Sequence, residues 1–162
     1  MFKKYRFSFF VIIVLGVLVD QLTKNFAMSK LEDGSHFYGG TRLGFELAYN
    51  SGSAFSLFGG STLLLTILSI SICSYLIYAY PKNQNRLMQL AFNLIIAGAL
   101  GNVVDRFVRT PYNGKGHVVD FIVLWSWPTF NVADSLVTIG VVLAIVATLF
   151  FNTHSAKEAS SN

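Results

Sequence analysis

Four long apolar stretches constrain the fold of this sequence more than any other feature. They run over about 7–28, 62–80, 87–107 and 132–151. Each is long enough to cross a bilayer as a helix, which takes about 20 residues. Only 12% of the residues are charged and 53% are hydrophobic, whereas charged residues make up about 25% of a soluble domain. We therefore predict an all-α integral membrane protein, with four transmembrane helices in a single domain.

The first apolar stretch follows three basic residues near the start of the chain, and a secretory signal peptide begins in the same way. A signal peptide ends at a cleavage site of small residues. This stretch instead continues into Asp-Gln-Leu-Thr-Lys at 20–24, so we interpret it as a retained transmembrane helix. Asp20 and Lys24 are four positions apart and should lie on one face of that helix.

The basic residues indicate how the chain crosses the membrane, because cytoplasmic segments are enriched in Lys and Arg. Those at the chain ends and between the second and third stretches fall on one side of four antiparallel spans: Lys3, Lys4, Arg6, Lys82, Arg86 and Lys157. We therefore expect both termini in the cytoplasm. The net charge of +4 follows this membrane pattern, so we expect no nucleic-acid partner.

Two segments have the composition of short strands and turns. Segment 29–57 is rich in glycine and alternates over 45–49, and residues 118–124 are mostly β-branched or aromatic. Irregular backbone cannot face lipid with its polar groups unsatisfied. We therefore expect these segments to lie at the membrane interface or to pack on the helices. The polar segment 152–162 is expected to be disordered.

Four aspartates that are far apart in the sequence are expected at one membrane depth. Asp20 lies late in an outgoing helix and Asp105 late in another, while Asp134 lies early in a returning helix. Asp120 belongs to the outer segment between the last two helices. The antiparallel topology therefore gathers these carboxylates near the outer face of the membrane.

The sequence around the last two aspartates predicts how they are held. Asp120 stands within the expected strand over 118–124. Asp134 should lie in the first turn of a helix that begins near Pro128 or Asn131, with Asn131 as a plausible N-cap. A strand and a helix N-terminus joined by a short connector can bring two acids face to face.

One interpretation of these acids is structural. Each could reach interfacial water or pair with Lys24, Arg106 or Arg109, since an ionisable group at the membrane centre costs roughly 2.5–3.5 kcal/mol. Asp20 has Lys24 close in sequence, and Asp105 has Arg106. These pairs are typical of structural or substrate-orienting charges.

The other interpretation is catalytic and concerns Asp120 and Asp134. Neither has a Lys or Arg within four positions. Two unpaired acids brought together cannot both ionise cheaply, so one stays charged and the other protonated. Aspartic proteases use this arrangement to activate water and to protonate the leaving amine.

Other chemistries are less well supported by the sequence. The three histidines are far apart without metal-ligand spacing, so a zinc site is not expected. No Gly-x-Ser-x-Gly occurs, and Cys73 in its apolar run is interpreted as a small buried hydrophobe. A proton- or ion-coupled transporter would also gather acids, but usually near the midplane, with broken or repeated helices. A non-catalytic membrane scaffold is the remaining alternative.

Five short blocks, spread over residues 20–135, carry a family resemblance. In order along the chain they are Asp20-Gln21-Leu22-Thr23-Lys24, Asn50-x-Gly52-x-Ala54-Phe55, Gly98-Ala99-Leu100-Gly101-Asn102-x-x-Asp105-Arg106, Val118-Val119-Asp120-Phe121 and Phe130-Asn131-x-Ala133-Asp134-Ser135. Together they resemble the motif blocks of bacterial lipoprotein signal peptidase (signal peptidase II). The likeness is specific because all five blocks occur in the family's order.

The resemblance implies an aspartyl endopeptidase of the bacterial cytoplasmic membrane, with four helices, cytoplasmic termini and an extracytoplasmic β-cradle. It would remove signal peptides from prolipoproteins, cleaving just before a cysteine that carries diacylglycerol. It would act as a monomer among membrane lipids, without a cofactor or metal. Carried over block by block, Asp120 and Asp134 match the catalytic pair. Positions lining the substrate site are matched by Asn50, Gly52, Asn102, Arg106 and Asn131, and supporting polar positions by Asp20, Lys24 and Asp105.

Overall fold

The computed structural model describes the backbone of residues 2–31, 37–38, 43–52, 62–83, 85–110 and 112–160, and the side chains of residues 9–31, 43–52, 62–83, 85–110 and 112–150. Parts of the expected outer segment over 29–57 therefore lie outside the described residues. Ala54 and Phe55 of the second motif block are among them.

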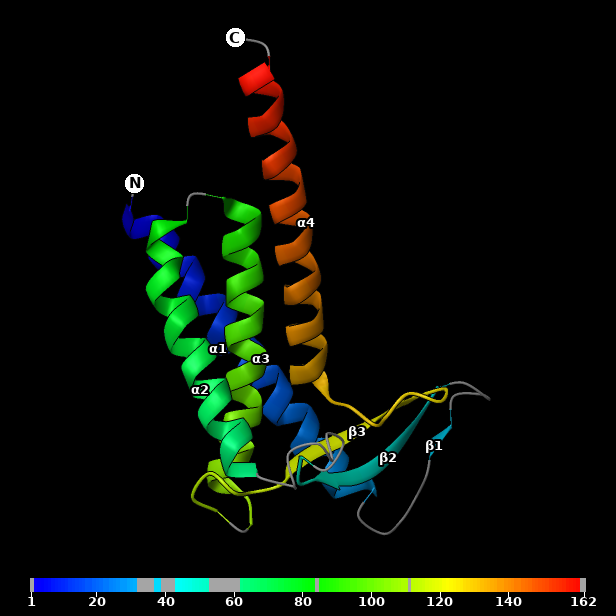
Figure 1. The fold of residues 1–162 in the computed structure, drawn as a ribbon. Helices are drawn as coiled ribbons and strands as arrows, with labels where there is room; N and C mark the ends of the chain where they lie inside the picture. Colours follow the sequence, from blue (N-terminus) through cyan, green and yellow to red (C-terminus); the bar gives the residue numbers. More distant parts are fainter. Residues whose placement is uncertain are drawn as a thin grey trace.

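Four helices run alternately up and down and form the body of the molecule (Figure 1). They are α1 (Phe2–Leu31), α2 (Thr62–Ala79), α3 (Arg86–Val108) and α4 (Val132–Ser160), and a short 3₁₀ turn, Tyr80–Lys82, follows α2. All four are long and apolar enough to cross a membrane. The predicted fold class, four transmembrane helices with a small sheet, is confirmed.

The last helix is longer than expected. Segment 152–162 was expected to be disordered, but α4 continues through Ser160. That prediction was wrong for most of the segment. Polarity alone does not end a helix, and residues 150–160 contain neither Pro nor Gly to break it.

Helix α3 is the centre of the bundle, since it packs against each of the other three helices. Its buried face carries small residues, among them Ala97, Gly98 and Gly101. A Cβ atom at Gly98 would collide with the Ala133 carbonyl oxygen of α4. Small side chains thus let the helix backbones approach closely, as is usual for helices that pack within a membrane. The outward faces of α1, α2 and α4 expose large apolar side chains suited to lipid.

An antiparallel sheet lies at the end of the bundle where α1 and α3 finish and α2 and α4 begin (Figure 1). Its strands are β1 (Phe37–Tyr38), β2 (Leu43–Asn50) and β3 (Val118–Leu124), in that order across the sheet. One apolar cluster fastens it to the last turns of α1, where Phe121 of β3 packs with Ala27 and Leu31. The sheet therefore places Asp120, next to Phe121, against the polar ends of the helices.

Candidate active site

The register of the sheet brings Asn50 to Asp120. Ala48 of β2 lies opposite Asp120 of β3, and Asn50 lies opposite Val118. Residues two apart on a strand share a face, so Asn50 is the diagonal neighbour of Asp120. The Asn50 Nδ2 atom donates a hydrogen bond of 2.9 Å to Asp120 Oδ2.

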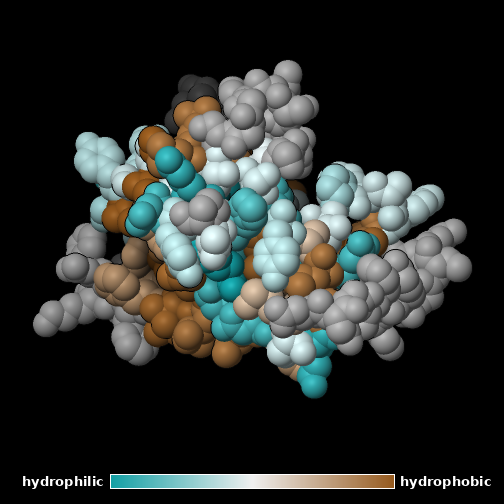
Figure 2. All heavy atoms as spheres, turned by 90° about the horizontal axis from the view of Figure 1, so that it is seen from below, coloured by the Kyte–Doolittle hydropathy of each residue, from teal (hydrophilic) through white to brown (hydrophobic). Residues whose placement is uncertain are grey.

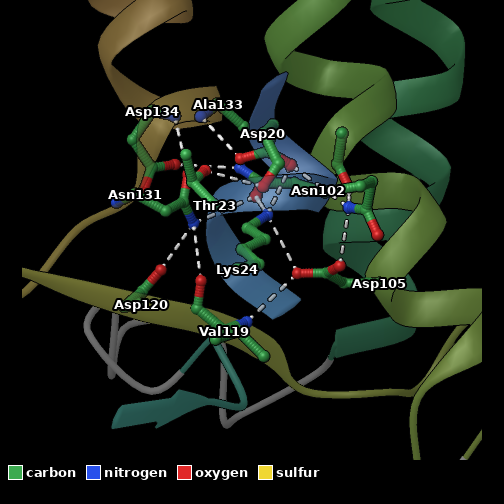
Figure 3. Close-up of polar contacts among 12 residues, drawn as sticks. Asp20, Thr23, Lys24, Asn102, Asp105, Val119, Asp120, Asn131, Ala133 and Asp134 are labelled. Atoms are coloured by element: carbon green, nitrogen blue, oxygen red, sulfur yellow. Dashed lines mark hydrogen bonds and ion pairs between the residues drawn. The ribbon is translucent and has the colours of Figure 1, made fainter. Parts of the chain in front are cut away.

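The chain after β3 folds back on the strand and returns Asn131 to Asp120. Leu124 accepts a hydrogen bond from the Trp127 amide and closes a turn. Phe130 then bridges to Ile122 in antiparallel fashion, with backbone bonds of 2.8 and 3.0 Å. Asn131 therefore emerges beside Asp120, and its Nδ2 donates to Asp120 Oδ1 at 2.6 Å (Figure 3).

Asn131 is also the N-cap of α4, as its position in the sequence predicted. Its Oδ1 accepts from the Asp134 amide at 2.9 Å, and its own amide donates to Asp134 Oδ2 at 3.2 Å. This reciprocal arrangement satisfies otherwise unpaired donors in the first turn. One residue thus contacts the carboxylates of both Asp120 and Asp134.

Asp134 receives its other hydrogen bond from the bundle centre. Asn102 of α3 donates from Nδ2 to Asp134 Oδ1 at 2.9 Å, and its Oδ1 accepts from Asn131 Nδ2 at 3.2 Å. In the part of the chain that the structure describes, no ion pair involves Asp120 or Asp134. Both carboxylates are held by amide donors.

Burial raises the pKa of Asp120 from 3.8 to about 6. The negative charge of Asp134 acts in the same direction, whereas the hydrogen bonds from Asn50 and Asn131 favour the ionised form and lower the pKa. Desolvation is the largest effect, because the residue is only 2% exposed. A carboxyl group with this pKa exchanges its proton near neutral pH.

A buried ammonium group organises the layer behind these two carboxylates. Lys24 Nζ lies 2.8 Å from Asp20 Oδ2, 2.9 Å from Asp105 Oδ2 and 3.0 Å from Asn102 Oδ1, which uses all three of its donors. Lys24, Asp20 and Asp105 are each fully buried. Asp20 Oδ1 also accepts from the Ala133 amide at 2.9 Å and so ties α1 to the start of α4.

Two of the three cations expected near the acids, Lys24 and Arg109, pair with Asp105, whereas Arg106, its neighbour in sequence, forms no ion pair with it among the described residues. Asp105 pairs with Lys24 of α1 and with Arg109, whose Nε lies 3.0 Å from Asp105 Oδ1. Residues four apart on a helix face each other, whereas adjacent ones such as Arg106 point elsewhere. Arg106 is 8% exposed, its Nε has no hydrogen-bond partner among the described residues, and its charge interacts with those of Asp134, Asp105 and Asp120.

Two polar contacts at Asp105 were not anticipated. Gln21 donates to Asp105 Oδ1 at 2.9 Å, and the Val119 amide donates to Asp105 Oδ2 at 3.1 Å. Gln21 belongs to the first motif block, and Arg109 is four positions from Asp105, so each had a signal in the sequence. The Val119 contact had none, because a backbone donor leaves no trace in residue identity.

Gly52 lies next to the candidate site and shapes the Asn50 side chain. Its amide donates to Asn50 Oδ1 at 2.7 Å and thereby directs Asn50 Nδ2 to Asp120. The backbone has φ +86°, and a Cβ atom there would collide with Leu65. Glycine is the residue that fits both conditions.

All the predicted site residues thus lie at one end of the bundle, on five different elements. Seen from below, hydrophilic residues gather over the middle of this end, with apolar residues on both sides (Figure 2). Among the described residues, no group of three or more His, Cys, Asp or Glu side chains could hold a metal ion. The arrangement provides two carboxylates that one residue, Asn131, contacts, and the pKa of one of them, Asp120, is raised by burial.

Comparisons with known proteins give the family. Residues 12–150 match the family model described as signal peptidase (SPase) II. The lipoprotein signal peptidase of Rhodococcus jostii is 38% identical over 145 residues, covering 89% of this chain and 73% of that protein. The one from Gloeothece citriformis is 35% identical over 166 aligned positions, covering 99% of each. A bacterial membrane enzyme solved by the in meso method at 2.3 Å resolution is 34% identical in sequence and matches with a TM-score of 0.78. The match covers 91% of this chain and 90% of the chain of that enzyme. This chain, a multi-pass membrane protein, therefore belongs to the signal peptidase II family of lipoprotein-processing peptidases.

Proposed function

We propose that this protein is an aspartyl endopeptidase that removes the signal peptide from prolipoproteins whose cysteine already carries diacylglycerol. Cleavage takes place on the N-terminal side of that cysteine, with Asp120 and Asp134 as the catalytic pair. The observation that carries this proposal is the position of Asn131, which donates to Asp120 Oδ1 at 2.6 Å and to Asp134 Oδ2 at 3.2 Å. One residue therefore holds both carboxyl groups, by its side-chain Nδ2 and its backbone N–H, and the charge of Asp134 raises the pKa of Asp120, which favours a single proton on the pair.

The reaction follows from this shared proton. The ionised carboxylate takes a proton from water while the oxygen of that water bonds to the scissile carbonyl carbon. The protonated carboxyl group donates its hydrogen to the carbonyl oxygen, which is becoming negative. The C–N bond then breaks as the C=O bond re-forms. The proton taken from water passes to the leaving amine nitrogen of the cysteine, and one hydroxyl proton of the intermediate returns to the carboxylate that had donated it. The pKa of Asp120, raised to about 6, supports a role for it in holding the proton.

Three other side chains are suited to orient the substrate. Asn50 and Asn102 each hold one carboxylate, at 2.9 Å in both cases. The buried Arg106 guanidinium keeps an unused Nε donor beside the pair. Its positive charge favours the ionised form of the nearby carboxylate and is available to a peptide carbonyl. Asp20, Lys24 and Asp105 hold α1, α3 and β3 together behind them.

The depth of the site suits a lipidated substrate. A diacylglyceryl group keeps the bond to be cut at the membrane surface, and these acids lie where the helices end. We propose that this end faces outward from the bacterial cytoplasmic membrane and that both termini are cytoplasmic. The apolar surfaces of α2 and α3 then offer contact for the acyl chains, and one copy of the chain forms the complete site.

The test is cleavage of a synthetic prolipoprotein peptide by the purified protein in detergent. We expect one cut, before the cysteine, when that cysteine carries diacylglycerol, and a far slower cut in the matched peptide without the lipid. Cleavage should persist with a strong chelator and in Cys73→Ser, since Cys73 lies buried in the apolar part of the bundle. Loss of activity with chelator and its return with a divalent metal would contradict the proposed acid/base pair.

A further inference from the structure

The turn between β3 and α4 exposes an apolar surface that the proposed reaction does not use. Trp125 is 72% exposed and Trp127 is 71% exposed. Leu124 of β3 and its cross-strand partner Leu43 of β2 are exposed beside them. We call these four residues the tryptophan tip. No charged residue occurs between Asp120 and Asp134, so the turn itself contributes no charge to this surface.

The backbone conformation at Trp125 is one that a tryptophan rarely adopts. Trp125 has φ +52° and follows Leu124, whose carbonyl accepts the Trp127 amide at 2.9 Å. A positive φ at this position of a two-residue turn is ordinarily given to Gly, Asn or Asp. A bulky aromatic residue is costly there and persists when it gains something elsewhere. An indole that stays 72% exposed is best accommodated where its ring meets apolar and its N–H meets polar surroundings.

The position of the tip relative to the helices indicates its depth in the membrane. In Figure 1 the end of β3 and the chain that follows reach sideways from the helices, level with the start of α4. The membrane-spanning part of α4 begins at Val132, only five positions after Trp127. A surface beside the bundle at that level lies in the boundary between lipid headgroups and acyl chains. Tryptophan is enriched at that depth because its ring is apolar and its N–H is polar.

We propose that the tryptophan tip inserts into the headgroup boundary of the membrane that the helices cross and anchors the sheet to the lipid surface. The occupant is lipid, in continuity with the surface around α4, and not a second copy or a soluble partner. Because Asp120 belongs to the same strand as Leu124, an anchored tip would also fix the sheet at the depth of the helix ends. The proposal does not depend on the protein being a peptidase.

The sequence allows a direct test, because Trp125 and Trp127 are its only two tryptophans. The intrinsic fluorescence of the unmodified full-length protein therefore reports on the tip alone. The protein is reconstituted in vesicles of phosphatidylcholine and phosphatidylglycerol. Part of the lipid carries bromine either high on the acyl chain or near the bilayer centre, and iodide is added outside. Trp125→Phe and Trp127→Phe then assign the signal to each ring.

Two reporters calibrate the measurement in the Trp125→Phe/Trp127→Phe background. Leu68→Trp places an indole on the lipid-facing side of α2, and Tyr112→Trp places one in the loop after α3; both sites are 53% exposed. Deep bromine should quench the first reporter most, and iodide should quench the second most.

For the native tip we expect the largest loss of emission with shallow bromine, weak quenching by iodide and emission blue-shifted from the Tyr112→Trp reporter. Quenching by iodide as strong as that of the Tyr112→Trp reporter would overturn the proposal, because the tip would then lie in water. Shielding from both iodide and bromine would overturn it in favour of a protein contact. Strongest quenching by deep bromine would overturn the assigned depth.

Discussion

At the scale of single residues, the candidate catalytic pair is held by neutral amides, whereas the acids behind it are held by cations. Asn50, Asn102 and Asn131 bond to Asp120 or Asp134. An amide orients a carboxylate without fixing its charge, because it compensates only part of that charge. Among the described residues, Asp120 and Asp134 are therefore oriented without a cation bonded to either of them.

The first prediction concerns that pair. Asp120→Asn and Asp134→Asn keep the shape of the side chain and remove the group that exchanges a proton. Each should lower the cleavage rate of lipidated peptide by at least about 10³-fold, with the double variant hardly slower than either single one. Asp20→Asn and Asp105→Asn are the matched controls, and any loss there should accompany weaker binding or a lower Tm. A single Asp120 or Asp134 variant that cleaves near the parent rate would refute the pair.

The second prediction concerns pH. Asp120 titrates at about 6 and is protonated below that value, so kcat/KM should fall as pH rises through this pKa. Asn50→Ala removes a donor that stabilises the ionised form of Asp120. The pKa of Asp120 should therefore rise, and the alkaline limb of the plot of kcat/KM against pH should move to higher pH. A shift of roughly 1–2 units is expected, since a hydrogen bond to a charged group contributes about 1.5–3 kcal/mol and one pKa unit is about 1.4 kcal/mol.

The matched control for Asn50→Ala is Gln21→Ala, which removes an amide donor from Asp105 instead. It should leave the position of the limb unchanged. Carboxyl ¹³C chemical shifts measured against pH would follow Asp120 directly. A limb that stays in place or moves to lower pH in Asn50→Ala would contradict the assignment.

The third prediction concerns Lys24, whose three donors are all used by buried acceptors. Lys24→Met leaves Asp20 and Asp105 without this cation, and removing one partner of a buried ion pair costs about 3–5 kcal/mol. A large drop in Tm is therefore expected. Asp105 keeps its ion pair with Arg109, so adding Asp20→Asn removes the carboxylate that has lost its cation and should recover part of the stability. A Tm equal to that of the parent would show that water compensates the carboxylates.

At the scale of elements, helix α4 reaches the site because α3 offers it a surface of small residues. Gly98→Val should separate α3 from α4, since even a Cβ atom there meets the Ala133 carbonyl oxygen and Val137. Overpacking of this kind costs about 1–3 kcal/mol or more, and activity should fall with stability. Ser71→Val, on the exposed side of α2, adds the same side chain and should leave the Tm within error. Equal effects of the two variants would mean that α4 can move away without cost.

Local patterns in the sequence predicted the elements, and long-range pairing escaped them. The β-branched run around Asp120 and the position of Asn131 predicted a strand and an N-cap, and both are observed. Three cations were candidates for Asp105, and the sequence could not choose among them, because Lys24 lies 81 positions away, 105 minus 24. The return of Phe130 onto Ile122 depends on the turn at Trp125, where the residue type gives no sign of a positive φ. The extension of α4 was missed because a polar helix and a polar coil have similar composition.

At the scale of the whole molecule, the start of α1 and the end of α4 lie at the end opposite the sheet (Figure 1). If this end is cytoplasmic, reporter fusions at Asn85 and Asn152 should read cytoplasmic, and fusions within 112–115 should read external. The physical reason is the basic residues at the end of the bundle where α1 starts, because cytoplasmic segments are enriched in Lys and Arg. An external reading at Asn85 would reverse the orientation and place the site on the wrong side for a translocated substrate.

The hydrogen bond from the Ala133 amide to Asp20 has a consequence for the timing of biosynthesis. It joins the first helix to the last, 113 residues apart, and Asn131 and Asp134 also arrive with that last helix. A ribosome that has made α1, α2, α3 and even β3 has delivered only one of the two carboxylates. On the proposed mechanism, the chain therefore enters the membrane inert. It would cut peptides only after its own final segment has inserted, so a partly made copy would not attack polypeptides crossing the same membrane.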